Sequence, residues 1–520
     1  MIAALDLRLG IDVGSTNTDA VVVDRDDRVL VKAKTPTSVD VTRGIAAAIE
    51  LVIAELGDQR GRITHAMLGT THAMNAVIER RDLRRVAVLR IGGPATRAVP
   101  PLATWPGDLR DAVVAGATVV DGGIELDGSE IAPLDLDAAA RFFDALAGRT
   151  DAVAITSVFS SVSDRHELAA GELARAIFGE VPVSLSHEIG TIGLLERENA
   201  TVFNAALGGL AEHVADAFGA ALGTHGLDPA KYIAQNDGTL MAFEHALSYP
   251  VLTMGCGPAN SLRGAARLSG ADDALVADVG GTSTEIGPIV GGFPCESDEV
   301  VGVAGVRTNF RMPSLVTMPL GGGTIVGNGD GAVTLGPASV GYRLEDETLV
   351  FGGATATLTD AAVADGRIEL GDHPLPRERC RLLIAALRRS DELLAEAVDR
   401  AKIARSEPLL VVVGGAGFLV PDDLAGVSEV RRPEHHEVAN AIGAAIAQVG
   451  GQVERIVHPG VIGRRAALET VYEEARSRAV RAGADPDRTQ IVEVEEVPLA
   501  YLTDPAVRIR VKAVGPLALT

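Results

Sequence analysis

The sequence predicts an α/β protein built from two related halves that face each other across a cleft. Segments with strand patterning alternate with segments of helical periodicity along the whole chain. A strand–turn–strand unit near the N-terminus occurs again about half a chain later. A third glycine-rich turn follows a buried strand, at VVVGGAGF (411–418).

The composition narrows the class of protein. The chain has 520 residues and is 47% hydrophobic but only 3% aromatic, so its cores must consist mainly of Ala, Val, Leu and Ile. The net charge of −23 argues against nucleic acids and anionic membranes as partners, because both attract basic surfaces. The sequence shows neither a basic leader with an apolar run nor a stretch near the roughly 18 apolar residues of a membrane span. Three distant cysteines, Cys256, Cys295 and Cys380, indicate no disulfide framework. We therefore expect a soluble, cytoplasmic protein.

The first part of the chain, 1–190, is predicted to form one domain. Apolar runs around Gly-rich or Asp-rich turns predict strand–turn–strand at 7–30, and helical periodicity predicts a helix at 41–56. The same criteria predict a strand, polar turn and helix at 63–81, strands at 84–93, 151–160 and 181–190, a hairpin at 120–135, and helices at 135–148 and 164–178.

The second domain is predicted over 191–450, and a smaller α/β tail over 451–520. A long helix is expected at about 194–222, and small-residue helices at 259–270 and 437–451. A strand and turn are expected at 231–241 and strand–turn–strand at 274–290. A Gly-rich region with hairpin signals follows at 291–358, then a buried strand that ends in a Gly-rich turn at 409–421, and in the tail strands with a helix at 464–482.

The repeated unit carries the chemistry. DVGSTNTDA (12–20) aligns with DVGGTSTEI (278–286), so that Asp12 matches Asp278. Glycines let backbone N–H groups approach an anion, threonine hydroxyls add donors, and a carboxylate at the strand end suits Mg²⁺ rather than phosphate itself. Two such turns facing each other would hold the β- and γ-phosphates of a nucleotide, and the third turn would back its adenosine. The predicted phosphate contacts are Gly14, Ser15, Thr16 and Thr18 on one side and Gly280, Gly281, Thr282 and Thr284 on the other, with Gly414, Gly415 and Gly417 at the adenosine.

Taken in order, the three turns resemble the phosphate-1, phosphate-2 and adenosine motifs of the actin-like (ribonuclease H-like) ATPase superfamily. That resemblance implies duplicated domains with an interdomain nucleotide cleft, and ATP with Mg²⁺ as cofactors. It places Asp12 near the metal through water, and Asp278 either as a second metal-side carboxylate or as the group that orients the attacking oxygen.

Further segments resemble the hydantoinase/oxoprolinase A-subunit family. They are GTTHAMNAVIERR (69–81), SHEIGTIGLLERENATVFNAAL (186–207), GCGPANSLRGA (255–265) and LGGGTIV (320–326), although Cys256 stands where the family usually has serine. The family implies ATP-dependent opening of a cyclic amide such as a hydantoin or a 5-oxoproline-like lactam, together with a separate B-type subunit. For substrate contacts we nominate Thr70, Thr71, His72, Asn75 and Glu188.

Other interpretations stay open at this point. The chain could be a carboxylase subunit of the acetone-carboxylase type, or a non-catalytic ATPase switch of the chaperone type. His72 could cap its helix, the run Glu196–Glu198 could be a charged helix surface, and Cys256 has no identifiable histidine partner for a nucleophilic role. A homo-oligomer is also compatible with the sequence.

Overall fold

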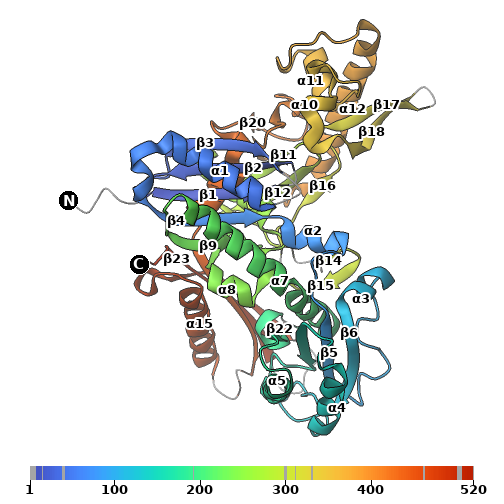
Figure 1. Ribbon diagram of the computed structural model, residues 1–520, viewed down its shortest axis with the longest axis vertical. Helices are drawn as coiled ribbons and strands as arrows, with labels where there is room; N and C mark the ends of the chain where they lie inside the picture. The colour runs from blue at the N-terminus through green and yellow to red at the C-terminus, as the bar shows by residue number, and fades with distance from the viewer. Residues whose placement is uncertain are drawn as a thin grey trace.

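The computed structural model describes residues 7–14, 16–37, 41–190, 192–297, 301–310, 312–329, 332–458, 460, 463–499 and 506–518 (Figure 1). Ser15, one of the predicted phosphate contacts, lies outside the described residues. In the described part of the chain, no helix is both long and apolar enough to cross a membrane.

A nine-stranded sheet holds the first of the two related halves. Its strand order is β22-β23-β21-β10-β9-β4-β1-β2-β3. The bounds are β1 (Leu7–Val13), β2 (Asn17–Val23), β3 (Val29–Pro36), β4 (Ile63–Thr70), β9 (Ala230–Ala234), β10 (Leu240–Ala242), β21 (Val449–Val457), β22 (Gln490–Leu499) and β23 (Ala506–Gly515). The sheet takes strands from all three predicted segments, so the boundaries at 190 and 450 divide the chain but not this sheet. That each segment is a domain of its own stays a prediction.

A six-stranded sheet holds the second half. It runs β13-β12-β11-β19-β20, with β16 paired to β12. The bounds are β11 (Ala274–Val279), β12 (Thr284–Val290), β13 (Phe293–Pro294), β16 (Val316–Met318), β19 (Leu409–Val413) and β20 (Glu429–Arg431). In both halves the first strand pairs antiparallel with the next strand and parallel with a later one, β4 beside β1 and β19 beside β11. The repeated sequence unit is therefore a repeated structural unit.

Two lobes extend from these sheets (Figure 1). One is a four-stranded sheet, β6-β5-β7-β8, with β5 (Val86–Gly93), β6 (Val114–Asp121), β7 (Ala152–Ser157), β8 (Val183–Leu185) and helices α3 (Gly107–Val113), α4 (Leu136–Leu146) and α5 (Arg165–Phe178). The other contains β17 (Thr324–Gly329), β18 (Ala332–Ser339), α10 (Leu344–Glu347), α11 (Leu358–Asp365) and α12 (Arg377–Ala401). A small hairpin, β14 (Val301–Val303) with β15 (Val306–Thr308), packs beside α7 (Leu194–Thr224).

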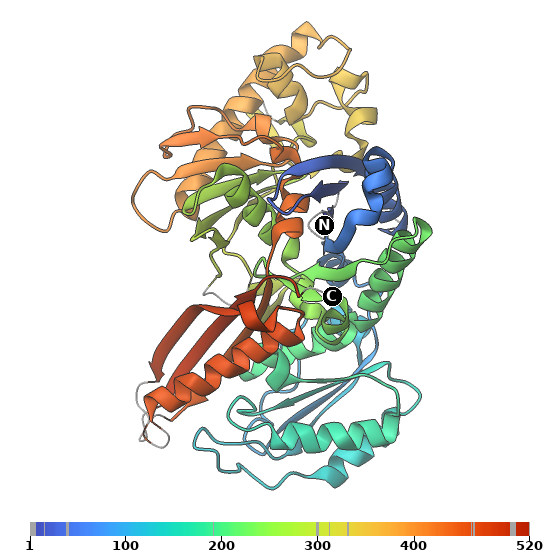
Figure 2. The same ribbon diagram turned by 90° about the vertical axis from the view of Figure 1, so that its left-hand side faces the viewer.

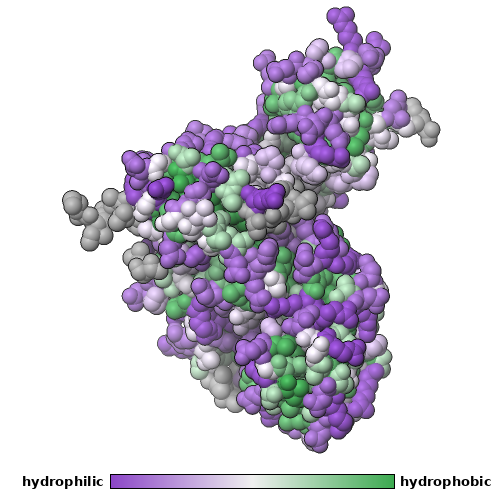
Figure 3. All heavy atoms as spheres, in the orientation of Figure 1, coloured by the Kyte–Doolittle hydropathy of each residue, from purple (hydrophilic) through white to green (hydrophobic). Residues whose placement is uncertain are grey.

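The C-terminal strands and helix α15 (Arg464–Arg481) lie beside the first lobe, as Figure 2 shows. A contact between His458 Nε2 and the Leu126 carbonyl, at 3.2 Å, joins them. Figure 3 shows hydrophilic side chains over much of one face of the molecule, with patches of apolar ones on the lobes at the top and the bottom and at the upper left.

Helix packing explains the small-residue segments. α1 (Val41–Leu56) and α7 pack against each other, and α13 (Ala439–Ile446) packs on β1, β2 and β4. α13 also crosses α9 (Cys256–Ser269) at very short range. A Cβ on Gly264 would lie 1.9 Å from the Ala439 carbonyl oxygen, and one on Gly443 would lie 1.9 Å from that of Asn260. Only glycine allows this reciprocal backbone contact.

Most predicted elements are confirmed, and two need correction. The strand expected at 181–190 ends at Leu185, and α6 (Ser186–Ile189) follows, because the Ser186 hydroxyl and the His187 N–H turn inward to Glu167 at 2.5 and 2.9 Å. The helix expected at 437–451 ends at Ile446, because Val449–Gly451 pair with β23.

Candidate nucleotide site and its surroundings

Two glycine-rich turns join paired strands at equivalent places in the two halves. The Gly14 N–H donates to the Asn17 carbonyl at 3.0 Å, and the Gly280 N–H donates to the Ser283 carbonyl at 2.9 Å. The turns also meet, since a Cβ on Gly281 would lie 3.2 Å from Thr16 Oγ1. The predicted arrangement, in which the two turns face each other, is confirmed.

The turns line one cleft of about 610 Å³ together with the third turn. This is within the range of roughly 300–1,000 Å³ of small-molecule sites. Gly414 has a φ of +88°, and its Cβ would lie 2.4 Å from Asp278 Oδ1, so glycine is required there. The predicted residues that line the cleft are Asp12, Gly14, Thr16, Asp278, Gly280, Gly281, Thr282, Gly414 and Gly415.

Three other predicted contacts support the cleft from behind. Thr18 Oγ1 is buried and lies 3.2 Å from Thr37 Oγ1, and the Thr284 hydroxyl donates to the Leu320 carbonyl at 2.6 Å. Gly417 is buried, and its Cβ would meet Val412 at 3.1 Å. These three residues therefore stabilise the walls of the cleft and do not face into it, because their polar groups or backbone are directed into the protein.

Two asparagines that the sequence analysis did not select hold Asp12. Asn260 Nδ2 donates to Asp12 Oδ1 at 3.1 Å, and Asn440 Nδ2 donates to Asp12 Oδ2 at 3.0 Å and to Asp19 Oδ2 at 3.0 Å. Asn260 lies on α9 and Asn440 on α13. The sequence signal that could have identified these two asparagines is that each follows an alanine in a small-residue helix, at 259–260 and 439–440.

Negative charge is concentrated at this end of the cleft. Burial, with Asp19 and Asp278 nearby, raises the pKa of Asp12 to about 7 despite the two asparagines. Burial, with Asp278 and Asp12, raises the pKa of Glu285 to about 7. Lys34 pairs with Asp19 at 2.7 Å. Such an excess of carboxylates fits a site for a divalent cation.

The form of metal binding follows from the ligands present. Among the described residues, no group of three or more His, Cys, Asp and Glu side chains is arranged to hold a metal ion on its own. Mg²⁺ at phosphate sites needs only one or two carboxylates, since waters and phosphate oxygens complete its shell. Asp12 and Asp278 fit that demand.

Two further glycine segments support the turns. A Cβ on Gly69 would lie 2.2 Å from Asp12 Oδ1, which mirrors Gly414 beside Asp278. In the loop at 320–324, the Gly322 and Gly323 N–H groups donate to the carbonyls of Gly280 and Gly281 at 3.0 and 2.7 Å. The glycines of these two sequence motifs therefore fix the position of the cleft.

Comparison with known proteins now identifies the family. Residues 8–178 match the hydantoinase/oxoprolinase N-terminal region, and residues 197–401 match the hydantoinase/oxoprolinase domain. The chain belongs to the hydantoinase/oxoprolinase family. It is 29% identical over 460 residues to caprolactamase subunit alpha of Pseudomonas jessenii, which covers 82% of this chain and 62% of that protein. The chain thus spans about three fifths of the length of the curated relatives it matches.

Solved structures show the same fold. The ATP-dependent caprolactamase from Pseudomonas jessenii superimposes with a TM-score of 0.81 at 21% identity, over 98% of this chain and 88% of that chain. Nucleotide-free acetone carboxylase gives a TM-score of 0.69 at 16% identity, over 98% and 88%. The predicted α/β, actin-like ATPase-type fold is confirmed.

The nominated substrate contacts are dispersed in this family member. Thr71 lines the cleft, and its hydroxyl donates to the Val13 carbonyl at 3.3 Å. Thr70 and His72 contact each other and line a small apolar pocket, where burial lowers the pKa of His72 to about 4. Asn75 is half-buried and is not among the residues that line the cleft, and Glu188 lines a separate cavity. The structure does not bring these five residues together.

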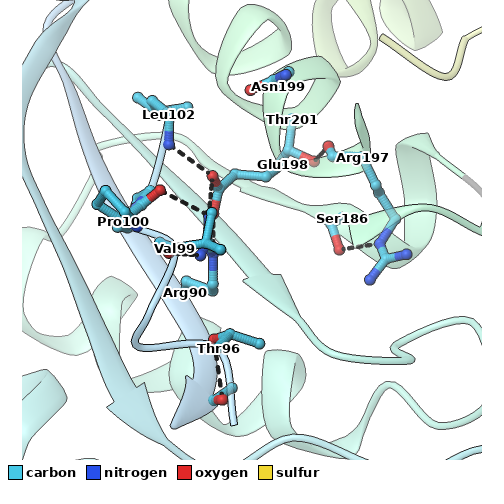
Figure 4. A network of polar contacts seen from close by, with 12 residues as sticks. Arg90, Thr96, Val99, Pro100, Leu102, Ser186, Arg197, Glu198, Asn199 and Thr201 are labelled. Atoms are coloured by element: carbon cyan, nitrogen blue, oxygen red, sulfur yellow. Dashed lines mark hydrogen bonds and ion pairs between the residues drawn. The ribbon is translucent and has the colours of Figure 1, made fainter. Parts of the chain in front are cut away.

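Two residues of the Glu196–Glu198 run are buried rather than on a helix surface. Figure 4 shows Glu198 accepting from the Leu102 N–H, at 3.0 Å, and lying against Arg90. The Arg90 guanidinium donates to both Glu198 carboxylate oxygens at 2.7 Å. Arg197 Nε donates to the Ser186 hydroxyl at 2.9 Å. The start of α7 is therefore fixed to the first lobe by buried charges.

Cys256 is buried beside the cleft. Its thiol donates to the Thr70 carbonyl at 3.2 Å, and burial, with Asp12 nearby, raises its pKa to about 12. A neutral thiol is a poor nucleophile. The position of Cys256 thus agrees with a packing role.

Proposed function

We propose that this chain is an A-type subunit that uses ATP to activate the carbonyl of a cyclic amide for hydrolysis. The observation that carries the proposal is the pair of facing turns, 12–18 and 278–284, on one cleft with the third turn at Gly414. Membership of the hydantoinase/oxoprolinase family supports it. The caprolactamase relative supports a lactam as the class of substrate.

Each cleft residue has a role in this proposal. The backbones of the two turns, with the Thr16 and Thr282 hydroxyls, bind the β- and γ-phosphates, and Gly414 and Gly415 allow the adenosine to lie against backbone. Asp12 and Asp278 are the carboxylates that would hold Mg²⁺, which in phosphoryl transfer neutralises charge on phosphate oxygens. Asn260 and Asn440 keep the Asp12 carboxylate in place through the hydrogen bonds described above.

The chemistry explains why ATP is needed. Amide resonance makes a lactam carbonyl weakly electrophilic, and its nitrogen leaves poorly. Attack of the carbonyl oxygen on the γ-phosphorus forms an O–P bond as the bond to ADP breaks. Water then adds to the activated carbon, the ring nitrogen leaves as an amine, and a second water releases phosphate from the acyl phosphate. We propose that a B-type subunit completes these hydrolytic steps. As a user of ATP, the protein would act in the cytoplasm.

Phosphate release from ATP tests the proposal. The purified chain, alone and with a B-type subunit, is assayed with a hydantoin, 5-oxoproline, caprolactam, and acetone plus bicarbonate. We expect a cyclic amide to raise ATP turnover, and Asp12→Asn to abolish that rise. Asp26→Asn, in the exposed turn after β2, is the matched control and should behave as the wild type. Stimulation by acetone plus bicarbonate but by no cyclic amide would support the carboxylase alternative, and turnover that no compound changes would support the ATPase switch.

A further inference from the structure

A second cavity lies between the first lobe and the C-terminal elements. It has a volume of about 220 Å³ and shares no lining residue with the nucleotide cleft. Its walls come from α6, the turn after β9, α8 (Phe243–Ser248), β21 and α15. α15 lies close to the first lobe in Figure 2. The cavity contains Glu188, but none of the other nominated substrate contacts.

One wall of the cavity is strongly cationic. Arg455 comes from β21, and Arg478 and Arg481 come from α15. Glu474 pairs with Arg455 and lies 3.8 Å from Arg478, while the Arg481 guanidinium donates to the Ser477 hydroxyl at 3.0 Å. Burial, with Arg455 beside it, lowers the pKa of Arg478. Glu474 is thus the counter-charge of both Arg455 and Arg478. The cluster of three arginines stands out in a protein whose net charge is −23.

The other wall carries an acid and two aromatic rings. The His245 and Tyr249 rings lie 4.7 Å apart between centroids. Glu188 lies beside the Tyr249 hydroxyl, and burial together with that carboxylate raises the pKa of Tyr249. Burial, with Arg478 and Arg481, lowers the pKa of His245 to about 4, so His245 is neutral at neutral pH. The lining also contains His187, Asp237 and Glu454. Asp237 is paired with Lys512 at 2.7 Å, whereas Glu188 is the carboxylate beside the Tyr249 ring.

We propose that this cavity binds a small zwitterionic amino acid, with its carboxylate on Arg478 and Arg481 and its ammonium group at Glu188. Guanidinium groups recognise a carboxylate by paired N–H donors. A phosphate dianion fits less well because Glu188 repels it, and a simple amine fits less well because of the three arginines. Ring opening of a cyclic amide places an ammonium and a carboxylate on one molecule. The cavity therefore suits the product of the proposed reaction. Only this identification of the ligand as the product rests on the proposed function.

Calorimetric titration of the full chain tests the assignment. The probes are 4-aminobutanoate, 5-aminopentanoate and L-glutamate, with pentanoate and pentylamine carrying one charge each. We expect at least one amino acid to bind about tenfold or more tightly than either single-charge probe, because both ends gain a charged partner. Arg481→Gln should weaken that binding about tenfold, and Glu188→Gln should weaken amino-acid binding but not pentanoate binding.

Controls separate this site from the nucleotide cleft. Arg476→Gln removes an exposed arginine of α15 that pairs with Glu473, and should leave the affinity unchanged. Asp12→Asn should remove ATP turnover but keep amino-acid binding, so that the two proposals fail separately. Absence of saturable binding by all three amino acids would overturn the assignment. Equal affinity for pentanoate, or binding that neither Arg481→Gln nor Glu188→Gln alters, would overturn it too.

Discussion

The crossing of α9 and α13 allows a quantitative prediction for Gly264→Ala. The added Cβ would lie 1.9 Å from the Ala439 carbonyl oxygen, whereas real Cβ contacts stay above 3.0 Å. The two backbones must therefore move apart by about 1 Å in a close-packed interior. Overpacking of this kind costs about 1–3 kcal/mol, and the better helix propensity of alanine returns up to about 1 kcal/mol. We expect a net loss of about 1–2 kcal/mol of stability.

The same separation of α9 and α13 should also weaken nucleotide binding. Asn260 and Asn440 lie on the two crossing helices, and both donate to the Asp12 carboxylate, at 3.1 and 3.0 Å. Separation of the helices lengthens at least one of these bonds, so we expect Mg-ADP to bind about tenfold more weakly to Gly264→Ala. A tenfold change corresponds to about 1.4 kcal/mol.

Urea denaturation followed by circular dichroism and calorimetric titration with Mg-ADP measure the two effects. Gly219→Ala is the matched control, because Gly219 is inside α7 and its Cβ would meet no atom within 4 Å. That control should be unchanged or slightly more stable. If Gly264→Ala and Gly219→Ala have the same urea midpoint and the same affinity for Mg-ADP, the steric reasoning is refuted.

Three other predictions concern buried polar groups. Glu198→Gln should lower stability by about 3–5 kcal/mol in urea denaturation, because it leaves the buried Arg90 charge uncompensated, and Arg90→Met combined with Glu198→Leu should cost less than the single change. Burial opposes the charges of Glu167 and His187, yet their 2.7 Å hydrogen bond and the opposite charges nearby outweigh it, so the pKa of Glu167 lies below its ordinary 4.5 and that of His187 above its ordinary 6.5. Their stabilisation is complete between pH 4.5 and 6.5 and is lost as pH falls through the folded-state pKa of Glu167 or rises through that of His187; His187→Gln should flatten the loss of stability above pH 6.5. Iodoacetamide should leave Cys256 of the folded protein unlabelled while urea exposes it, as mass spectrometry of digests will show.

Local chemistry determines which parts of the site a sequence can reveal. The turns after Asp12 and Asp278 could be predicted because glycine, threonine and aspartate must occur close together in each copy. Asn260 and Asn440 could not be selected in the same way, because their role depends on where two helices cross. That crossing is a tertiary contact, and the sequence shows only two small-residue helices.

Adjacency in sequence was a poor guide to the substrate contacts. Thr70 ends β4 and His72 begins α2 (His72–Glu79), so the chain changes direction between them. Thr71 consequently faces the cleft, while Thr70 and His72 line an apolar pocket with residues of α7 and α8. The burial of Arg197 and Glu198 was equally difficult to predict, because a charged helical run usually lies on a surface. The partner of Glu198 is about 100 residues away, and that of Arg197 lies in another element.

The two halves of the duplicated unit are alike in backbone but not in polar contacts. Gly69 beside Asp12 and Gly414 beside Asp278 occupy equivalent places, and in each a Cβ would collide with the aspartate. Asp12 accepts from both asparagines, one from each crossing helix, whereas burial raises the pKa of Asp278 with the Ser261 hydroxyl opposing it. A carboxylate held on both oxygens keeps one orientation. We propose that this asymmetry makes Asp12 the carboxylate of fixed orientation that would hold Mg²⁺, and Asp278 the group that would orient the attacking oxygen.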